Sequence, residues 1–431
     1  MISMKLMVIN KFYEILTKRP QRFFKKDFYL RLFRIIRSSL VVGNQPAANR
    51  PRIYFDLSVF SIFDNRTGVQ RVIRSVYSEL KLLVGSEYEL VPVAATAFTK
   101  GFQVLKEENT TKSTNFKLTG VNIVAREGDV FFSLEQAFLE HLAHISEFET
   151  MKQCGCKVIL TVYDLLPIQL PECFPPEVEG IFKLWLKETS KVAEYICDSK
   201  TVKIDLDNYL AQNNLNKPNS SWFYPGCDFI KSISTRGLTS EQKSFLADSC
   251  KFKFNFLMVG TVEPRKGHRL VYSLFESLWQ NGHENISLTF VGKEGWMVDD
   301  LTSSFLRSKF YKKNFFWFNK ASDEFLNNCY NSADAVIIAS LNEGFGLPIL
   351  EAAYHERRII ANDIPIFREV APENCFFINL KKTEVALRQL QLWLEKPSEK
   401  CYLSSPPSWH SAAKLILNRI KGEQVIKTVL Y

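Results

Sequence analysis

The sequence of 431 residues has no apolar run of the roughly 18 to 20 residues that a membrane-spanning helix needs, so we do not expect an integral membrane protein. The apolar stretch at residues 6–9 is too short for the core of a signal peptide, which argues against secretion. Nine cysteines, odd in number and scattered, suit a reducing compartment better than a disulfide framework. These absences lead us to expect a cytoplasmic protein.

Internal repeats, low-complexity tracts and metal-binding motifs are also lacking. His141 and His144 stand three residues apart, but no third ligand accompanies them, so we expect an ordinary helix surface and no metal site. Hydrophobic residues make up 46% of the chain and charged residues 23%, which excludes the disordered and fibrous classes. The length allows two to three domains with cores of their own.

Acidic residues are scarce in the first 50 residues, where Glu14 and Asp27 face eleven lysines and arginines. This arm carries the whole net charge of +9, and the rest of the chain is neutral. A nucleic-acid binder usually carries its charge on the folded domain, so we expect no nucleic-acid partner. Five apolar residues share one helical face of the arm: Phe24, Phe28, Leu32, Ile35 and Ile36. Two interpretations stay open, because residues 10–38 could lie on an anionic membrane surface or pack on the protein body.

After a linker at residues 41–51, short apolar segments alternate with helical patterns, which is typical of parallel sheets covered on both faces. The expected strands are residues 53–57, 130–132, 158–162 and 194–197, then 254–259, 286–291, 315–318, 335–339 and 358–361. We predict two doubly wound α/β domains with a boundary near residues 235–250. The expected divisions are the arm (1–50), a first domain (51–245), a second domain (246–403) and a C-terminal helical segment (404–431) that crosses back to the first.

Residues 340–353 (SLNEGFGLPILEAA) follow an expected buried strand and should open a helix, since Pro348 suits a first helical turn. Gly344 and Gly346 leave backbone N–H groups free at the helix N-terminus, which favours an anion such as a diphosphate. Glu343 and Glu351 flank this turn and would repel a phosphate unless each accepts hydrogen bonds from hydroxyls. Sugar hydroxyls are the natural donors.

Residues 260–267 (GTVEPRKG) form a second expected turn from strand to helix. Arg265 and Lys266 would stand beside the N-terminus of the helix that starts near His268. Cations are unfavourable at that end of a helix, so an anionic ligand that neutralises them is the simplest account.

These two segments resemble the donor domain of glycosyltransferase family 4, whose members are retaining enzymes of the GT-B fold. Glu343 and Glu351 stand at the family's E-x7-E spacing, and residues 260–267 resemble its diphosphate loop. The similarity covers about residues 250–380. The resemblance implies two Rossmann-like domains that face a central cleft, and a nucleotide-sugar donor.

By that resemblance, Arg265 and Lys266 would hold the donor's diphosphate and serve catalysis. Glu351 would bind the ribose, and Glu343 the hydroxyls of the donor sugar near the reacting carbon. No metal or other cofactor is implied, since positive side chains and a helix terminus neutralise the leaving diphosphate in GT-B enzymes. The remaining donor-site candidates in this half are Gly260, Thr261, Gly344, Phe345, Gly346 and Leu347.

The first half carries a weaker resemblance to the family's glycine loop, which faces the diphosphate across the cleft. Its candidates are Gly68, Gln70 and Arg71, and a plain turn with a basic cap remains the alternative. Where many relatives have a histidine before an aspartate, this chain has Tyr163 before Asp164. Asp164 is expected as a polar contact at the reacting centre. A front-face path, in which the leaving phosphate takes the acceptor proton, needs no histidine.

We therefore expect a hexosyltransferase, resembling mannosyltransferases, that acts on a glycan or lipid-linked acceptor in the synthesis of a cell-surface polysaccharide such as O-antigen, capsule or exopolysaccharide. A lipid-linked acceptor would give the arm a purpose, which is to hold the protein at the inner face of the plasma membrane. Two alternatives stay open, a non-catalytic sugar-nucleotide-binding subunit of an assembly complex and a GT-B nucleotide-sugar epimerase. The donor nucleotide and the linkage cannot be read from these residues.

Overall fold

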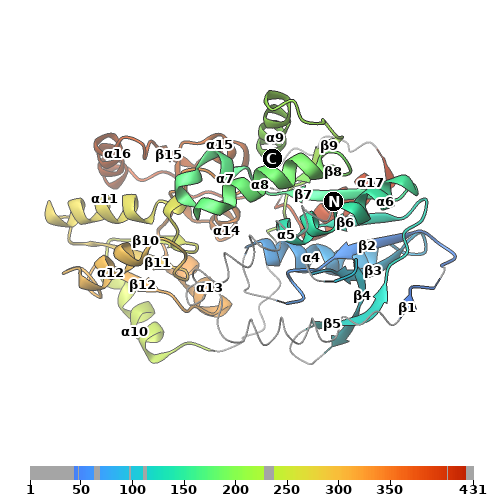
Figure 1. Cartoon of the computed structure of the whole chain (residues 1–431). Coiled ribbons are helices and arrows are strands. Elements are labelled where there is room, and N and C mark those ends of the chain that lie inside the picture. The colour runs from blue at the N-terminus through green and yellow to red at the C-terminus, as the bar shows by residue number, and fades with distance from the viewer. Residues whose placement is uncertain are drawn as a thin grey trace. The chain divides into compact units, whose positions relative to one another are not determined.

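The computed structural model describes residues 43–46, 48–62, 68–96, 99–109, 114–227, 237–404 and 406–423, so the basic arm of the sequence prediction lies outside the described residues. The chain forms two compact units, each with helices packed on a sheet (Figure 1). The first contains the described residues up to Tyr163, Glu177–Tyr224 and the last helix. The second contains Asp164–Pro176 and Pro225–Ser408. The chain passes from the first unit to the second after Tyr224, before the expected boundary near residues 235–250. A short segment of the first half, Asp164–Pro176, also belongs to the second unit.

The sheet of the first unit has nine strands in the order β1-β5-β4-β3-β2-β6-β7-β8-β9. They are β1 (Gly43–Asn44), β2 (Arg52–Asp56), β3 (Glu89–Ala94), β4 (Gln103–Asn109), β5 (Thr114–Asn122), β6 (Val130–Ser133), β7 (Lys157–Val162), β8 (Glu194–Cys197) and β9 (Ser220–Trp222). The expected apolar strands are β2, β6, β7 and β8, and every residue of β2 and β6 is buried. These strands pair in parallel, as predicted.

Strands β4 and β5, which the sequence did not predict, differ from these strands, because β4 pairs antiparallel with both β3 and β5. In β4, Leu105 is buried while the next residue, Lys106, is exposed. Antiparallel strands can leave one face in water, so their sequences alternate instead of forming the short apolar runs used for the prediction.

The described helices of the first unit come from three parts of the chain. They are α4 (Gly68–Leu83), α5 (Phe138–Ala143), α6 (Ile145–Gln153), α8 (Pro176–Thr189), α9 (Lys200–Gln212) and α17 (Trp409–Lys421). The last helix, α17, packs on α4, and its apolar face shares the core of this unit. Ion pairs flank this contact, His410 with Glu79 at 3.0 Å and Lys421 with Glu87 at 2.6 Å. The chain therefore returns to its first unit at α17.

Asp56 is fully buried at the carboxyl end of β2 and joins several elements of the first unit. Its carboxylate accepts hydrogen bonds from Ser58 Oγ at 2.5 Å and Ser133 Oγ at 2.8 Å, and lies 2.9 Å from His141 Nε2. Trp185 Nε1 donates to His141 Nδ1 at 3.2 Å, so the imidazole carries its proton on Nε2 and donates it to Asp56. His141 and His144 are 0% and 1% exposed, so the expectation of a helix surface is wrong.

Replacing Asp56 by alanine is expected to lower the free energy of unfolding of the first unit by about 3 kcal/mol, since four buried donors, the Ser58 amide among them, lose their acceptor at once. Urea denaturation measures this. Glu149→Ala, which removes an exposed carboxylate of α6, is the control and should change stability by less than about 0.5 kcal/mol. Equal small effects would mean that the network contributes nothing net.

The sheet of the second unit has six strands, all parallel, in the order β12-β11-β10-β13-β14-β15. They are β10 (Phe254–Val259), β11 (Ile286–Val291), β12 (Phe315–Phe318), β13 (Ala335–Ile338), β14 (Arg358–Asn362) and β15 (Phe376–Ile378). The five predicted strands match β10 to β14 within one residue. The strand order reverses between β10 and β13, and in doubly wound sheets ligands bind at the carboxyl ends on either side of such a point.

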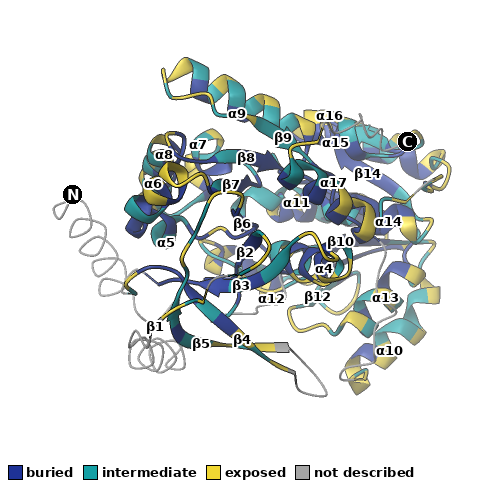
Figure 2. Ribbon diagram, turned by 90° about the vertical axis from the view of Figure 1, so that its right-hand side faces the viewer, coloured by how far each residue is buried: buried dark blue, intermediate teal, exposed yellow. Residues whose placement is uncertain are grey.

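Helical segments of the second unit cover both faces of this sheet (Figure 1). They are α7 (Leu166–Gln169), η1 (Pro171–Cys173), α10 (Ser240–Asp248), η2 (Ser249–Lys251), η3 (Pro264–Lys266), α11 (His268–Gln280), α12 (Asp299–Arg307), α13 (Asp323–Ser332), α14 (Leu347–Tyr354), α15 (Pro365–Val370) and α16 (Thr383–Glu395). The strands are mostly buried while the helices expose their outer faces (Figure 2), so the prediction of two doubly wound α/β units is confirmed.

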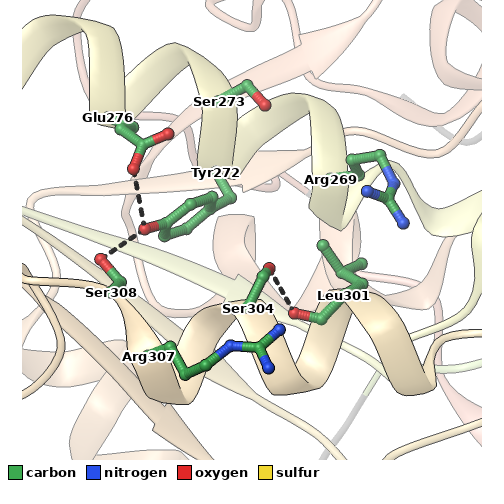
Figure 3. A pocket seen from close by; sticks show the side chains of 8 residues that line it. All are labelled: Arg269, Tyr272, Ser273, Glu276, Leu301, Ser304, Arg307 and Ser308. Atoms are coloured by element: carbon green, nitrogen blue, oxygen red, sulfur yellow. Dashed lines mark hydrogen bonds between the residues drawn. The ribbon is translucent and has the colours of Figure 1, made fainter.

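A pocket of about 300 Å³ opens between α11 and α12 (Figure 3). Tyr272 forms part of its wall, with its hydroxyl 2.6 Å from Ser308 Oγ and 3.3 Å from Glu276 Oε1. Arg269 and Arg307 stand at its exposed rim. None of the residues predicted from the sequence for the donor site lines this pocket.

The nine cysteines all lie in the described part of the chain, and all are free thiols. Among the described residues, no helix is both long enough and apolar enough to cross a bilayer.

Candidate functional site

The loop that follows β10 turns into α11 through a short 3-10 helix, η3. Gly267 ends this loop with φ = +77°, and a Cβ there would stand 2.3 Å from the carbonyl oxygen of Ala339. Only glycine combines this backbone conformation with such a close approach to the end of β13. The amide of Leu341 donates to the carbonyl of Arg265 at 2.8 Å, so the loops after β10 and β13 are bound to each other.

The loop after β13 opens α14 at Leu347, as the glycines and Pro348 predicted. Gly346 has φ = +93°, and a Cβ there would meet the ring of Phe367 at 2.8 Å. Phe345 is buried within the turn. The predicted residues Gly260 and Thr261 follow β10 directly, and Gly344 and Leu347 belong to this second turn. The two predicted motifs therefore meet at the reversal point of the sheet.

Glu343 is the centre of a partly buried charge cluster. Arg265 Nη1 lies 3.1 Å from Glu343 Oε2, Lys266 pairs with Oε1, and Ser340 Oγ donates to Oε1 at 2.6 Å. Burial by itself raises the pKa of a carboxyl, but the charges of Lys266 and Arg265 more than offset it and lower the pKa of Glu343 to about 2. Glu343 is thus an anion held by two cations at any physiological pH.

Two further carboxyls surround Arg265. Glu263 Oε2 lies 3.1 Å from Arg265 Nε. Asp164 accepts a hydrogen bond from the Leu166 amide at 3.1 Å and lies within the field of Arg265. Burial raises the pKa of both carboxyls, and Arg265 works against that rise. The structure therefore brings four of the predicted residues together: Asp164, Arg265, Lys266 and Glu343.

The two cations beside the helix N-terminus pair with carboxylates of the same unit. The pattern gave no sign of this, because Glu343 stands 77 and 78 residues from its partners and only the reversal of strand order brings them together.

Glu351 lies in the second turn of α14 and is 5% exposed. Tyr330, which is buried in α13, donates its hydroxyl proton to Glu351 Oε2 at 2.6 Å. The ring of Tyr330 stacks on that of His355 with centroids 4.9 Å apart. These contacts fix the position of the carboxylate in a largely dry environment, where a hydrogen bond to a hydroxyl is stronger than in water.

Three of the candidates from the first half belong to the first unit. Gly68, Gln70 and Arg71 begin α4 in the first unit, and residues 63–67 before them lie outside the described part of the chain. Tyr163, at the end of β7, donates its hydroxyl to the carbonyl of Leu134 at 2.9 Å. The hydroxyl of Tyr163, which stands where many relatives have a histidine, is therefore engaged within the first unit.

His268 begins α11 and is 1% exposed, with its ring edge-on to Phe290. In the described part of the chain, neither ring nitrogen has a hydrogen-bond partner. Burial, with a contribution from the charge of Lys266, lowers the pKa of this imidazole to about 3. His268 is therefore neutral at neutral pH.

The burial of His268 predicts a pH-dependent stability. Below the ordinary pKa of 6.5 the unfolded chain takes up a proton that the folded chain refuses until about pH 3, so stability falls as the pH drops through this window. From pH 7.5 to 5.5, the unfolding free energy should fall by about 1 kcal/mol more in the wild type than in His268→Phe. Urea midpoints of both proteins at the two pH values measure this, and parallel slopes would contradict it.

Among the residues that the structure describes, no three histidine, cysteine, aspartate or glutamate side chains gather as ligands of a metal ion. The polar groups of the site are the cluster of Asp164, Glu263, Arg265, Lys266 and Glu343, the backbone of two loops, and Glu351. This set offers cations to phosphate oxygens and carboxylates to hydroxyls.

Most of the residues of this site lie in a segment that matches a known protein family. Residues 247–405 match the family described as "Glycosyl transferases group 1". The serotype-specific mannosyltransferase WbdA of Escherichia coli is 31% identical over 94% of this chain and 51% of its own length. The O-antigen chain mannosyltransferase RfbU of Salmonella typhimurium (strain LT2) is 25% identical over 51% of this chain and 56% of its own. The chain spans about half the length of the curated relatives it matches.

Solved structures give a similar picture of the fold. Anabaena Alr3699/HepE, crystallised with UDP and glucose, superposes with a TM-score of 0.53 at 13% identity over 86% of this chain and 95% of that one. The trehalose-6-phosphate synthase OtsA superposes with a TM-score of 0.58 at 9% identity over 87% and 99% of the two chains. At these identities the likeness shows the fold alone.

Proposed function

We propose that this chain is a retaining hexosyltransferase of the GT-B fold that uses a nucleoside diphosphate sugar, since residues 247–405 match the family described as "Glycosyl transferases group 1". The observation that carries the proposal is the partly buried cluster of Arg265, Lys266 and Glu343 at the reversal point of the second sheet. It joins cations suited to a diphosphate with a carboxylate suited to sugar hydroxyls.

In the proposed mechanism, Arg265 and Lys266 bind the diphosphate and offset the charge that grows on it as the bond from the anomeric carbon to the phosphate oxygen breaks. The acceptor oxygen bonds to the same face of that carbon, and its proton passes to the departing phosphate oxygen. Glu343 orients the sugar through its hydroxyls, Glu351 binds the ribose, and Asp164 lines the reacting centre. These positive groups also carry the proposal that no metal ion is required, so activity should survive EDTA.

Gly68, Gln70 and Arg71 are proposed to complete the diphosphate site from the first unit. The names of the relatives support mannose as the transferred sugar and O-antigen as the product class. A lipid-linked acceptor, with residues 10–38 at the membrane surface, remains our proposal for how the enzyme meets its substrate.

Calorimetric titration of the full chain with GDP, UDP, CMP and ADP tests the donor site, and incubation of the preferred nucleotide's sugar with a glycan acceptor tests transfer. We expect one diphosphate to bind selectively and its sugar to be transferred with retention. A folded protein that binds none would overturn the proposal. Binding without transfer would point to the non-catalytic subunit, and conversion of the nucleotide sugar without an acceptor would point to the epimerase.

A further inference from the structure

The segment Asp164–Pro176 enters the second unit from the first half of the chain. It follows β7, contains α7 and η1, and leads into α8. Since β7 and α8 both belong to the first unit, the chain visits the second unit here for only a short stretch. The side chains that hold this stretch come from the loops of the candidate site.

The first attachment joins Gln169 to the loop that carries Glu343. Asn342 Nδ2 donates to Gln169 Oε1 at 2.7 Å, while Asn342 Oδ1 accepts the amide proton of Glu343 at 2.9 Å. One amide side chain thus links the segment to the residue at the centre of the charge cluster.

The second attachment joins the end of the segment to the loop after β11. The indole Nε1 of Trp296 donates to the carbonyl of Cys173 at 2.8 Å, and its ring lies 5.9 Å from that of Phe174. The loop itself is held close to Glu263: the Gly295 amide donates to the Val262 carbonyl at 3.0 Å, and a Cβ on Gly295 would stand 2.7 Å from Glu263 Cγ. The loop that carries Trp296 is therefore attached to the loop after β10, which carries Arg265.

We infer that Trp296 and Asn342 are positioning residues, which hold the segment Asp164–Pro176 against the donor loops and so place Asp164 beside Arg265 and Glu343. Asp164 is the first residue of the segment, and the two attachments bind Gln169 in its middle and Cys173 near its end. These two hydrogen bonds and one aromatic contact link the loops after β13 and β11 to a short stretch that contributes no described strand to the second sheet. The kinetic consequence rests on the proposed function, whereas the attachment itself does not.

The test compares Trp296→Phe with Trp317→Phe. Both variants lose an indole donor to a backbone carbonyl, Cys173 at 2.8 Å for Trp296 and Gly292 at 3.0 Å for Trp317, but only Trp296 contacts the segment. Trp296→Phe should lower kcat about tenfold and leave KM for the donor and the Kd of the nucleoside diphosphate within about twofold. Trp317→Phe should leave all three within about twofold.

A double-mutant cycle with Asp164→Asn shows whether Trp296 acts through Asp164. The asparagine keeps the Oδ1 acceptor for the Leu166 amide, so the segment stays folded. We expect Trp296→Phe to change kcat less than about twofold in this background. A tenfold fall in both backgrounds would overturn the inference.

Hydrogen exchange of the amides of residues 165–174 gives a readout that needs no activity. Exchange should accelerate at least about tenfold in Trp296→Phe and remain unchanged in Trp317→Phe. Unchanged exchange in Trp296→Phe would refute the attachment. A wild-type protein without transferase activity would refute the proposed function, while the exchange result would still decide whether Trp296 orders the segment.

Discussion

Replacing Lys266 by alanine is expected to lower kcat by about a hundred- to a thousandfold, which is the usual cost of removing one preorganised group that stabilises developing charge. Lys266 stands in a partly buried cluster and holds Glu343 together with Arg265. As the proposed leaving diphosphate gains charge, a cation partly shielded from water lowers its energy more than a cation in bulk water would. The loss should fall mainly on kcat, because the charge develops in the transition state.

Initial rates of sugar transfer at saturating donor measure this effect, and Lys381→Ala, which removes an exposed lysine, is the matched control. Thermal melting of Lys266→Ala must show a folded protein, since Glu343 keeps Arg265 as its partner. Full activity in a folded Lys266→Ala variant would show that the cluster is not the site of leaving-group stabilisation. Loss in both lysine variants would indicate a general effect of charge.

The second large effect is expected for nucleotide binding by Glu351→Ala. A buried carboxylate that accepts hydrogen bonds from ribose hydroxyls contributes about 3 kcal/mol, so the Kd of the preferred nucleoside diphosphate should rise about a hundredfold. Tyr330 holds one oxygen of this carboxylate at 2.6 Å, which fixes its orientation before the nucleotide arrives. The reduced ordering cost is part of that affinity.

Isothermal titration calorimetry measures the Kd, with Glu395→Ala of α16 as the exposed control. Glu351→Gln keeps the shape of the side chain and an oxygen acceptor, so its Kd should fall between those of the wild type and the alanine variant. Unchanged affinity in Glu351→Ala would place the ribose elsewhere and remove this residue from the donor site.

Much of the second unit could be predicted from the sequence. Its strands are short apolar runs such as ISLTFV and AVII, buried on both faces, and each ends at a turn. The two turns from strand to helix could also be predicted, since glycines at 267 and 346 stand where the backbone takes a positive φ just before a helix. These are local signals, and local signals survive in a sequence.

Less of the first unit could be predicted from the sequence. Strands β4 and β5 mix lysines and glutamates with single apolar residues, because one face of this antiparallel pair meets water. The buried pair of Asp56 and His141 escaped prediction as well, since the partners lie 85 residues apart. A histidine that looks like a surface residue by spacing becomes a core residue once a tryptophan and a carboxylate satisfy both of its nitrogens.

The sequence by itself determined the α/β class, the strands of the second unit, and the two glycine turns with their charged residues, because each depends on neighbours within a few positions. Only the tertiary structure decided what those charges face. The strand order sets the β10 and β13 loops side by side, so Glu343 meets Arg265 and Lys266. The tertiary structure also brings the segment Asp164–Pro176 into contact with Trp296 and Asn342. Contacts between residues over a hundred positions apart depend on the path of the whole chain, and no local pattern records that path.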